Sequence, residues 1–429
     1  MKDNLPISSF DRSKSIVKSA IKISGKKAIQ FSKRAFLSTE NYTKEKEKIN
    51  NEIAISLFEN ISLLKGTAVK ITQALVLHNI LPSSIQKELS KSYNQIKPIN
   101  QVLIMKVLKN EFKKEYSNVF KKLNLKPFAS ASLGQVHLAI IDNNEQIAVK
   151  IQYPSIDKTI KNDIKLVKKL VFLKKNILSI IEEVEEKLYE EIDYKKEMKN
   201  NLWAYETFNS KDIIVAKVYE EYCTQHILTT SFIKGLDLYS WLLTNPKQRY
   251  KTIIANNMFD IFTKSIFEHK KIQADPNPAN YIITSENKLA LIDFGCVKSF
   301  EKTFIQNYIN ILKVYNSTNK NEILKFYKEI GCIQNIEDVS DDIFKTKILP
   351  FNKWAIEPFL NDEYKFTKEY LDEGVKYADM FLTKPFLVVK DFIFLDRVSH
   401  GLFSLFEQMN VVIDMRTFRE YLDFDDNKT

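Results

Sequence analysis

Four polar side chains, met in a fixed order along the chain, are of the types that carry out phosphoryl transfer. Lys150 ends an apolar, strand-like run, and Asp293 opens an Asp-Phe-Gly tripeptide after another apolar run. Between them, Asp275 and Asn280 stand in one polar loop. A lysine can hold nucleotide phosphates, an aspartate can accept or orient a proton, and an asparagine with a second aspartate can hold Mg²⁺. The order Lys, Asp, Asn, Asp therefore predicts a site of the protein-kinase type.

Each of these side chains also has a purely structural interpretation. A lysine at the end of a strand is usually solvated, and an aspartate after a strand can cap a turn. The joint occurrence of all four groups in the kinase order favours the chemical interpretation. We predict that Asp275 acts as a base or orients water. Its role is the least constrained of the four, because the sequence does not define which group accepts the phosphate.

The composition allows a large protein core. The chain has 429 residues, of which 44% are hydrophobic and 28% are charged. This length is sufficient for two or three domain-sized units. Its three cysteines are widely spaced, which indicates neither a disulfide framework nor a metal-binding set and suits a reducing compartment. We find no uncharged apolar run of 18 residues or more, as a membrane-spanning helix requires.

The positive charge is concentrated at the N-terminus. Residues 1–50 contain 12 basic and 5 acidic residues, which gives +7 of the formal net charge of +10. Residues 12–36 contain no acid and follow the spacing of a basic amphipathic helix. Such a helix either packs on the protein with a solvated face or lies on an anionic lipid surface. A mitochondrial transit peptide is a further alternative, whereas the near-balance of charge elsewhere argues against a nucleic-acid binder.

The pattern of apolar residues divides the chain into helical and mixed regions. Residues 45–125 are expected to be wholly helical, and residues 126–153 to form a β-hairpin whose first turn is rich in small residues. A charged helical region is expected next, followed by two strands. The chain from about residue 250 is expected to be mostly helical. The elements expected after the hairpin are helices over 155–210, strands within 213–233, short strands at 281–283 and 289–292, and a helical tail over 364–422.

Four local motifs resemble the UbiB-type (AarF-like) atypical kinase family. Residues 129–137 resemble its alanine-rich loop, which replaces the glycine-rich loop of ordinary kinases. Residues 148–154 resemble its Val-Lys-Val-Gln-(Tyr/Arg)-Pro pattern, and residues 190–197 its Glu-x-Asp segment. Residues 70–73, Lys-Ile-Thr-Gln, resemble its Lys-x-Gly-Gln signature. The resemblance covers roughly residues 50–410, most of the chain.

The resemblance implies roles for further residues. Glu197 is then the helix glutamate that pairs with Lys150, and Glu191 is the first acid of the Glu-x-Asp motif. Lys70 and Gln73 are expected to reach over the active site, with Lys70 near Glu191. The residues expected to cover the nucleotide are those of the alanine-rich loop, Ala129, Ser130, Ala131 and Ser132. The implied cofactors are ATP and Mg²⁺, the latter held by Asn280 and Asp293.

This sequence departs from the family pattern at several positions. Thr72 replaces a glycine of the signature, which places a side chain where the backbone usually approaches closely. Gln273 replaces the histidine usual before Ala-Asp, Asn277 replaces another usual histidine, and Ala279 replaces a usual glycine. None of these changes removes a charged catalytic group.

The implied fold is α+β and protein-kinase-like, with two lobes and a helical N-terminal extension. The expected divisions are a basic arm over 1–50, an extension over 51–125 carrying the Lys-x-x-Gln motif, a β-containing N-lobe over 126–235, and a mostly helical C-lobe over 236–429.

The resemblance implies an ATPase or small-molecule kinase that supports ubiquinone or prenyl-lipid biosynthesis. Its expected partners are ATP or ADP, an anionic membrane surface or prenyl lipid, and lipid-biosynthetic enzymes, with no nucleic acid. The expected location is the cytoplasm or the mitochondrial matrix, peripheral at a membrane. The alternative is a catalytically weak nucleotide-binding scaffold, which the departures at Thr72, Gln273 and Ala279 would favour.

Overall fold

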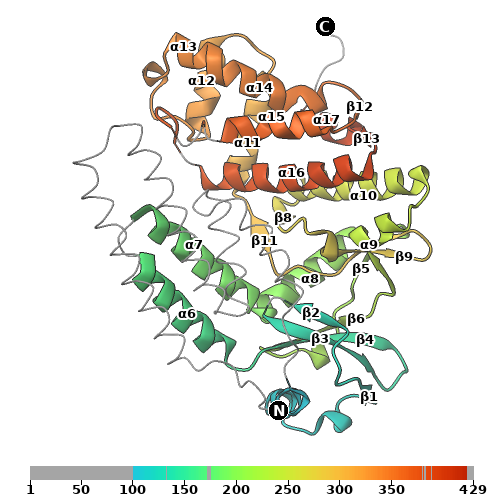
Figure 1. Cartoon of the computed structure of the whole chain (residues 1–429). Coiled ribbons are helices and arrows are strands. Elements are labelled where there is room, and N and C mark those ends of the chain that lie inside the picture. Colours follow the sequence, from blue (N-terminus) through green and yellow to red (C-terminus); the bar gives the residue numbers. More distant parts are fainter. Residues whose placement is uncertain are drawn as a thin grey trace, which may run out of the picture. The chain divides into compact units, whose positions relative to one another are not determined.

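The computed structural model resolves two compact units, and Figure 1 labels their elements. Unit 1 consists of the described residues up to Met198 together with Val218–Phe232, and unit 2 of Lys199–Lys217 and the described residues from Ile233 onward. The predicted basic helix and the predicted extension before residue 100 lie outside the described part. The residues that the structure describes are 100–131, 133–171, 175–378, 380, 383–387 and 389–422.

Unit 1 is built on an antiparallel sheet with the order β1-β3-β4-β6, in which β2 also pairs with β3. The predicted hairpin over residues 126–153 is confirmed, and its tight turn places Asn144 in the left-handed region with φ 67°. Asparagine tolerates that conformation better than most residues. The strands are β1 (Lys122–Leu123), β2 (Ala129–Ala131), β3 (Gly134–Ile140), β4 (Gln146–Gln152) and β6 (Ile227–Ser231).

Alternation along β4 decides which of its side chains enter the core. Ile147, Val149 and Ile151 are fully buried and belong to the same hydrophobic cluster as residues of helix α5 (Gln101–Phe112). Because successive strand residues point to opposite faces, Lys150 must point away from that cluster. Burial of the apolar set thus fixes the face on which the lysine lies.

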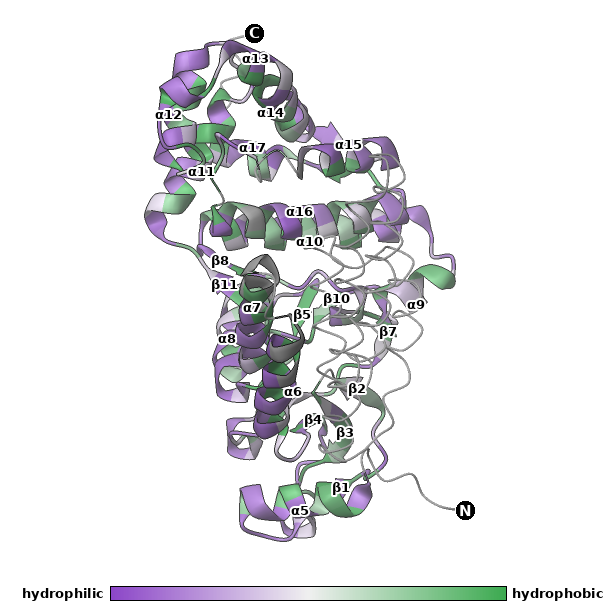
Figure 2. Ribbon diagram, turned by 60° about the vertical axis from the view of Figure 1, so that its left-hand side comes forward, coloured by the Kyte–Doolittle hydropathy of each residue, from purple (hydrophilic) through white to green (hydrophobic). Residues whose placement is uncertain are grey.

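Three charged helices follow β4, as the sequence predicts for residues 155–210. They are α6 (Ile156–Val171), α7 (Lys175–Glu191) and α8 (Tyr194–Phe208), and Figure 2 shows polar and apolar residues alternating along α6. Helices α6 and α7 pack together and are joined by an ion pair of 2.6 Å between Lys168 Nζ and Glu185 Oε2. Helix α8 begins in unit 1 and continues in unit 2.

Unit 2 contains a four-stranded sheet with the order β5-β10-β9-β7 and a two-stranded sheet, β11-β8. Strand β10 is parallel to β5 and antiparallel to β9. Its residues are all buried, as expected of a short apolar run covered on both faces. The strands are β5 (Ile213–Val215), β7 (Gly235–Asp237), β8 (Lys271–Gln273), β9 (Tyr281–Thr284), β10 (Leu289–Leu291) and β11 (Val297–Ser299).

Helices make up most of the rest of unit 2, and aromatic side chains pack between them. The Phe259 ring contacts the Phe406 ring edge to face and stacks on the Phe418 ring, with ring centroids 6.3 and 6.0 Å away. The helices are α9 (Leu238–Leu243), α10 (Gln248–Phe267), α11 (Lys302–Val314), α12 (Lys320–Glu329), α13 (Asp341–Ile343), α14 (Leu349–Ile356), α15 (Lys368–Ala378), α16 (Lys390–Met409) and α17 (Arg416–Leu422). Unit 2 also has 3₁₀ helices at Pro278–Asn280, Ile336–Asp338 and Glu357–Phe359 and a π-helix at Phe344–Ile348, and unit 1 has 3₁₀ helices at Tyr116–Asn118 and Glu220–Tyr222.

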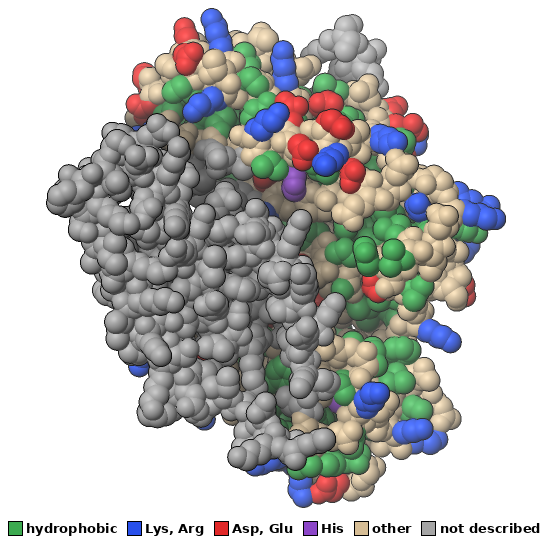
Figure 3. All heavy atoms as spheres, in the orientation of Figure 1, with side chains coloured by type: hydrophobic (Ala, Val, Ile, Leu, Met, Phe, Trp, Pro, Cys, Tyr) green, Lys and Arg blue, Asp and Glu red, His purple; other side chains and the backbone are tan. Residues whose placement is uncertain are grey.

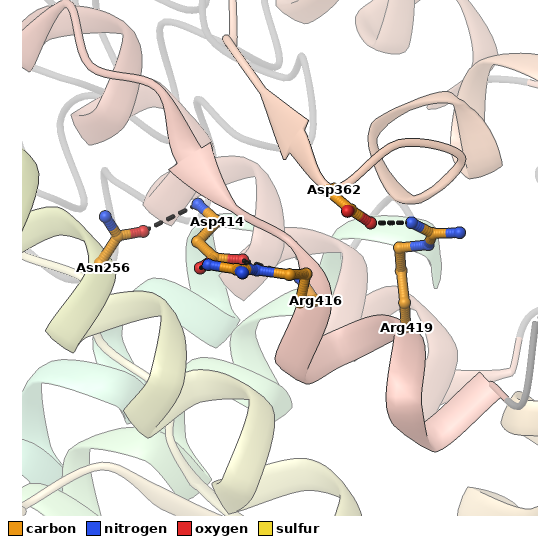
Figure 4. A network of polar contacts seen from close by, with 5 residues as sticks. All are labelled: Asn256, Asp362, Asp414, Arg416 and Arg419. Carbon is orange, nitrogen blue, oxygen red and sulfur yellow. Dashed lines mark hydrogen bonds and ion pairs between the residues drawn. The ribbon is translucent and has the colours of Figure 1, made fainter.

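A polar network ties the end of the described chain to the rest of unit 2 (Figure 4). The backbone N–H of Asp414 donates to Asn256 Oδ1 at 2.8 Å, and Arg416 forms a forked ion pair with the Asp414 carboxylate. Arg419 forms an ion pair with Asp362. These contacts anchor the two-stranded sheet of β12 (Glu363–Tyr364) and β13 (Ile413–Asp414) and the helix that follows it.

Several short strands were not predicted, and strands interrupt two regions that were predicted to be helical. Residues 45–125 are not wholly helical, because β1 pairs with β3 of the sheet. The strands β2, β7, β8, β11 and β12 also escaped prediction, and β13 interrupts the predicted helical tail over 364–422. The two strands predicted within 213–233 belong to different sheets. Strands of two or three residues are too short to show a period, so only their tertiary partners define them.

The surface of unit 2 carries charges of both signs. Figure 3 shows acidic and basic side chains interspersed over the helices around α12 to α15. This distribution accords with the near-balance of charge outside the N-terminal segment. None of the helices in the described ranges is long and apolar enough to cross a membrane.

The histidine of β3, His137, is buried and hydrogen-bonded at both ring nitrogens. His137 is fully buried, its Nδ1 lies 2.8 Å from the Asn124 carbonyl oxygen, and its Nε2 lies 2.9 Å from Gln135 Nε2. Since a carbonyl only accepts, Nδ1 donates and Nε2 accepts, which is the pattern of a neutral ring. Burial lowers the pKa of His137, although the bond to Asn124 opposes the shift.

We expect the free energy of unfolding to fall as the pH drops below about 6.5, where the unfolded chain binds the proton that the folded state excludes. Above that pH this contribution is fully present. Urea unfolding at pH 7.5 and 5.5 should show a smaller acid loss for His137→Gln than for the native chain. An equal loss in both proteins would contradict this account.

Candidate active site

The predicted lysine and glutamate form an ion pair in unit 1. Lys150 Nζ lies 2.7 Å from Glu197 Oε1, and the side chains are 18% and 3% exposed. The same ammonium lies 5.2 Å from the centre of the Tyr194 ring, within the range of a cation–π contact. A carboxylate so well buried holds the lysine in one position, as phosphate binding by a kinase requires.

The turn before α8 positions Glu197. Asp193 Oδ1 accepts a hydrogen bond of 3.0 Å from the Lys196 N–H, which is the geometry of an N-cap. The side-chain amide of Gln152, at the end of β4, donates to the carbonyl oxygen of Ile192. The second acid of the Glu-x-Asp segment thus starts the helix, and the strand that carries Lys150 also holds the helix start.

The alanine-rich loop forms a tight pairing of β2 with β3. Ala129, Ser130 and Ala131 face Val136, Gln135 and Gly134 across the two strands. A Cβ on Gly134 would lie 2.5 Å from the carbonyl oxygen of Ile151 and 2.9 Å from the Tyr194 hydroxyl. Only glycine therefore permits this close approach of β3 to its neighbours.

The residues predicted to form the catalytic loop lie in unit 2, between β8 and β9. The side-chain amide of Asn280 donates to the Asp275 carbonyl oxygen at 3.0 Å and to its Oδ2 at 3.2 Å. Asn280 is 9% exposed. Since both of these bonds use the NH₂ group, the amide is oriented so that its carbonyl oxygen is the atom that could bind a metal. Burial, followed by the charge of Asp275, raises the pKa of the neighbouring Tyr281.

Asp293 follows β10 and is held by backbone and side-chain groups. Its Oδ1 accepts a bond of 3.0 Å from the Gly295 N–H, and its carbonyl oxygen accepts one of 3.1 Å from Gln273 Nε2. Strands β8 and β11 pair so that Gln273 faces Val297, which brings the two loops together. The backbone N–H of Ile292 also donates to the Asn280 carbonyl oxygen at 3.3 Å.

The donor set of this loop pair fits Mg²⁺. It offers carboxylate and amide oxygens, which this ion prefers, and Mg²⁺ in such enzymes takes only one or two protein ligands beside water and phosphates. No group of three or more His, Cys, Asp or Glu side chains in the described ranges is placed to hold a metal. A Mg²⁺ site that is completed by nucleotide phosphates and water does not require such a group.

The structure thus brings the predicted residues together in two sets. Lys150 and Glu197 form the set in unit 1, where Glu191 ends α7 two residues before the Asp193 cap. The set in unit 2 consists of Asp275 and Asn280, which are hydrogen-bonded to each other, and Asp293, whose neighbour Ile292 donates to the Asn280 carbonyl oxygen. The roles of these residues stay predictions. Three further residues of the predicted site, Lys70, Gln73 and Ser132, lie outside the described residues.

Three supporting residues were not predicted as part of the site. Gln152 holds the turn before α8, Tyr194 contacts the lysine, and Asn200 donates to the carbonyl oxygen of Phe294 at 3.1 Å. Gln152 and Tyr194 stand inside segments that resemble family motifs, and this position in the sequence could have indicated that they belong to the site. Asn200 follows Glu197 by one helical turn, and only the tertiary structure reveals its partner.

Substitutions in the Lys150–Glu197 ion pair test how much its burial contributes to the strength of the pair. Lys150→Met removes the ammonium beside a carboxylate that is 3% exposed, so we expect a loss of about 3 kcal/mol in the free energy of unfolding. Adding Glu197→Gln should restore part of that loss, because the buried charge is then absent. The expected coupling energy in a double-mutant cycle is about 1–3 kcal/mol.

The control pair is Lys168 and Glu185, which are 32% and 28% exposed at a similar distance of 2.6 Å. A cycle of Lys168→Met and Glu185→Gln should give a coupling energy of at most about 1 kcal/mol. Equal coupling energies for the two pairs, measured by chemical denaturation, would show that burial does not set the strength of the Lys150 pair.

Comparison with known proteins gives the family. The ABC1 atypical kinase-like domain matches residues 91–327, more than half of the chain. The probable serine/threonine-protein kinase abkA of Dictyostelium discoideum is 28% identical over 342 residues, which is 74% of this chain and 60% of that protein. The mitochondrial atypical kinase coq-8 of Caenorhabditis elegans is 29% identical over 296 residues, 64% of this chain and 38% of that protein.

Mitochondrial atypical kinase COQ8 of Saccharomyces cerevisiae is 28% identical over 317 residues, 70% of this chain and 61% of that protein. The chain therefore spans 38% to 61% of the length of these three relatives.

A solved structure shares the fold. The Rv3197–erythromycin complex from Mycobacterium tuberculosis aligns with a TM-score of 0.64 at 21% identity, over 90% of this chain and 98% of that one. The predicted α+β, kinase-like fold is confirmed, with an antiparallel sheet in one unit and a mostly helical second unit. The predicted family resemblance is confirmed as well. The chain belongs to the ABC1 atypical kinase-like family, the UbiB family.

Proposed function

We propose that this protein binds ATP with Mg²⁺ and either hydrolyses it or transfers its phosphate to a small molecule. We further propose that this activity supports ubiquinone or prenyl-lipid biosynthesis at a membrane surface. The observation that carries the proposal is the buried Lys150–Glu197 ion pair, at 2.7 Å. Kinase-like enzymes use such a pair to hold the α- and β-phosphates of the nucleotide.

Each set of residues would have its own task. Lys150 binds the phosphates, and Glu197 keeps its ammonium in place. Asp275 accepts or orients the proton of the attacking hydroxyl or water. Asn280 and Asp293 would hold the ion with their side-chain oxygens, and the bound ion would neutralise phosphate charge. Ala129, Ser130, Ala131 and Ser132 would cover the nucleotide.

The membrane part of the proposal rests on the sequence and on the relatives. Residues 12–36 have the pattern of a basic amphipathic helix, which anionic lipid attracts. Two of the relatives carry the word mitochondrial in their names, which supports the mitochondrial matrix over the cytoplasm as the location. Lys70 and Gln73 would limit access to the site, so that the acceptor is small or is water.

A catalytically weak scaffold that binds nucleotide is the second candidate. It is favoured by the bond between Asn280 Nδ2 and Asp275 Oδ2 at 3.2 Å, which engages the proposed base. The departures at Thr72, Gln273 and Ala279 favour it as well. Turnover separates the candidates, since a scaffold binds nucleotide without releasing phosphate.

The test is Mg²⁺-dependent phosphate release from ATP, with and without anionic liposomes, for the native chain and for Asp293→Asn. We expect release that rises with liposomes and falls at least about 10- to 100-fold in the variant, the loss typical even of residues that support metal ligands. Asp372→Asn, at an exposed position of α15, is the matched control and should behave like the native chain.

Other outcomes would change the proposal in defined ways. Phosphate release that does not change when anionic liposomes are added would contradict the proposed action at a membrane surface. Thermal stabilisation by ADP without any release would favour the scaffold. Neither stabilisation nor release in the native chain would contradict nucleotide binding altogether.

A further inference from the structure

Two neighbouring carbonyl groups of the Asp-Phe-Gly segment are each held by a side-chain amide. The Asp293 carbonyl oxygen accepts from Gln273 Nε2 at 3.1 Å, and the Phe294 carbonyl oxygen accepts from Asn200 Nδ2 at 3.1 Å. Gln273 ends β8 and Asn200 belongs to α8, so the two donors come from elements far apart in sequence. All four residues belong to unit 2.

These bonds are made where water has little access. Asn200 is 6% exposed and Phe294 is 2% exposed, and Gln273 is half-buried. A buried carbonyl oxygen that loses its donor cannot replace it with water, so the segment favours the conformation that keeps both bonds. With the bond from the Gly295 N–H to Asp293 Oδ1, both the backbone and the carboxylate of Asp293 are oriented.

Asn200 lies on the same helix as Glu197, the partner of Lys150. Glu197 and Asn200 are three residues apart on the same helix and are both buried, which places them side by side on one face. One helical turn thus carries the partner of Lys150 and the partner of Phe294.

We propose that Asn200 and Gln273 are positioning residues that together hold Asp293 in the orientation that binds the metal–nucleotide complex. This inference rests on the proposed function and adds residues that act through the backbone of Asp293. Gln273 stands where the family usually has histidine, and its amide supplies an N–H donor at that position. Gln273→His should therefore preserve the function.

The experiment measures ADP binding by calorimetry, once with excess Mg²⁺ and once with a chelator. The native chain should bind ADP more tightly with Mg²⁺. Asn200→Leu and Gln273→Met remove the N–H donors and keep a side chain of similar volume. In these variants the increase in ADP affinity caused by Mg²⁺ should be about 3- to 10-fold smaller. Binding with the chelator should stay within about twofold of the native value, because Lys150 and Glu197 are intact.

The matched control is Asn201→Leu. Asn201 follows Asn200 on α8 and is 1% exposed, and its carboxamide oxygen has no hydrogen-bond partner among the described residues. Its removal should leave the Mg²⁺-dependent gain unchanged. Gln273→His should restore the gain lost in Gln273→Met. If Asn200→Leu does not fold, Asn200→Ser, which shortens the side chain, gives the same comparison.

Failure of the inference can be told from failure of the proposed function. A native chain whose ADP affinity does not respond to Mg²⁺ would contradict both. A native chain that responds, with Asn200→Leu and Gln273→Met responding equally, would contradict the positioning role alone. The same would follow if Asn201→Leu lost as much of the gain as Asn200→Leu.

Discussion

The Lys150–Glu197 ion pair is the interaction on which the arrangement of unit 1 depends. Its distance is 2.7 Å and its carboxylate is almost fully buried. Burying a carboxylate is costly unless a cation and hydrogen bonds compensate for lost water, so strand and helix are held in register by this requirement. The apolar face of β4 places the lysine, and the Asp193 cap places the first turn of α8.

In the loops of unit 2, the predicted site residues are oriented by hydrogen bonds to backbone carbonyls. Asp293 and Phe294 are fixed through their carbonyl oxygens, and Asn280 is fixed through its NH₂ group. The side-chain oxygens of Asn280 and Asp293 are the groups that could bind a metal. Neutral amide donors orient these residues without adding positive charge, which would compete with a bound cation.

Sequence reasoning was most successful where long patterns or several motifs coincided. The hairpin over 126–153 and the helices over 155–210 were predicted because alternation and helical spacing persist for many residues. It failed at β1, within a region expected to be helical, and at strands of two or three residues such as β8 and β11. These strands are stabilised by distant partners, and Gln273 reaches Asp293 only because β8 and β11 pair.

The sequence by itself determined the family, the fold class and the chemical types in the predicted site. It did so because the order of Lys150, Asp275, Asn280 and Asp293 is constrained by the chemistry of phosphate and metal binding. The tertiary structure alone decided which groups hold these residues in place. The contacts of Gln152 with Ile192 and of Asn200 with Phe294 join residues 40 and 94 positions apart, and no local pattern records such pairs, because they arise from packing between elements.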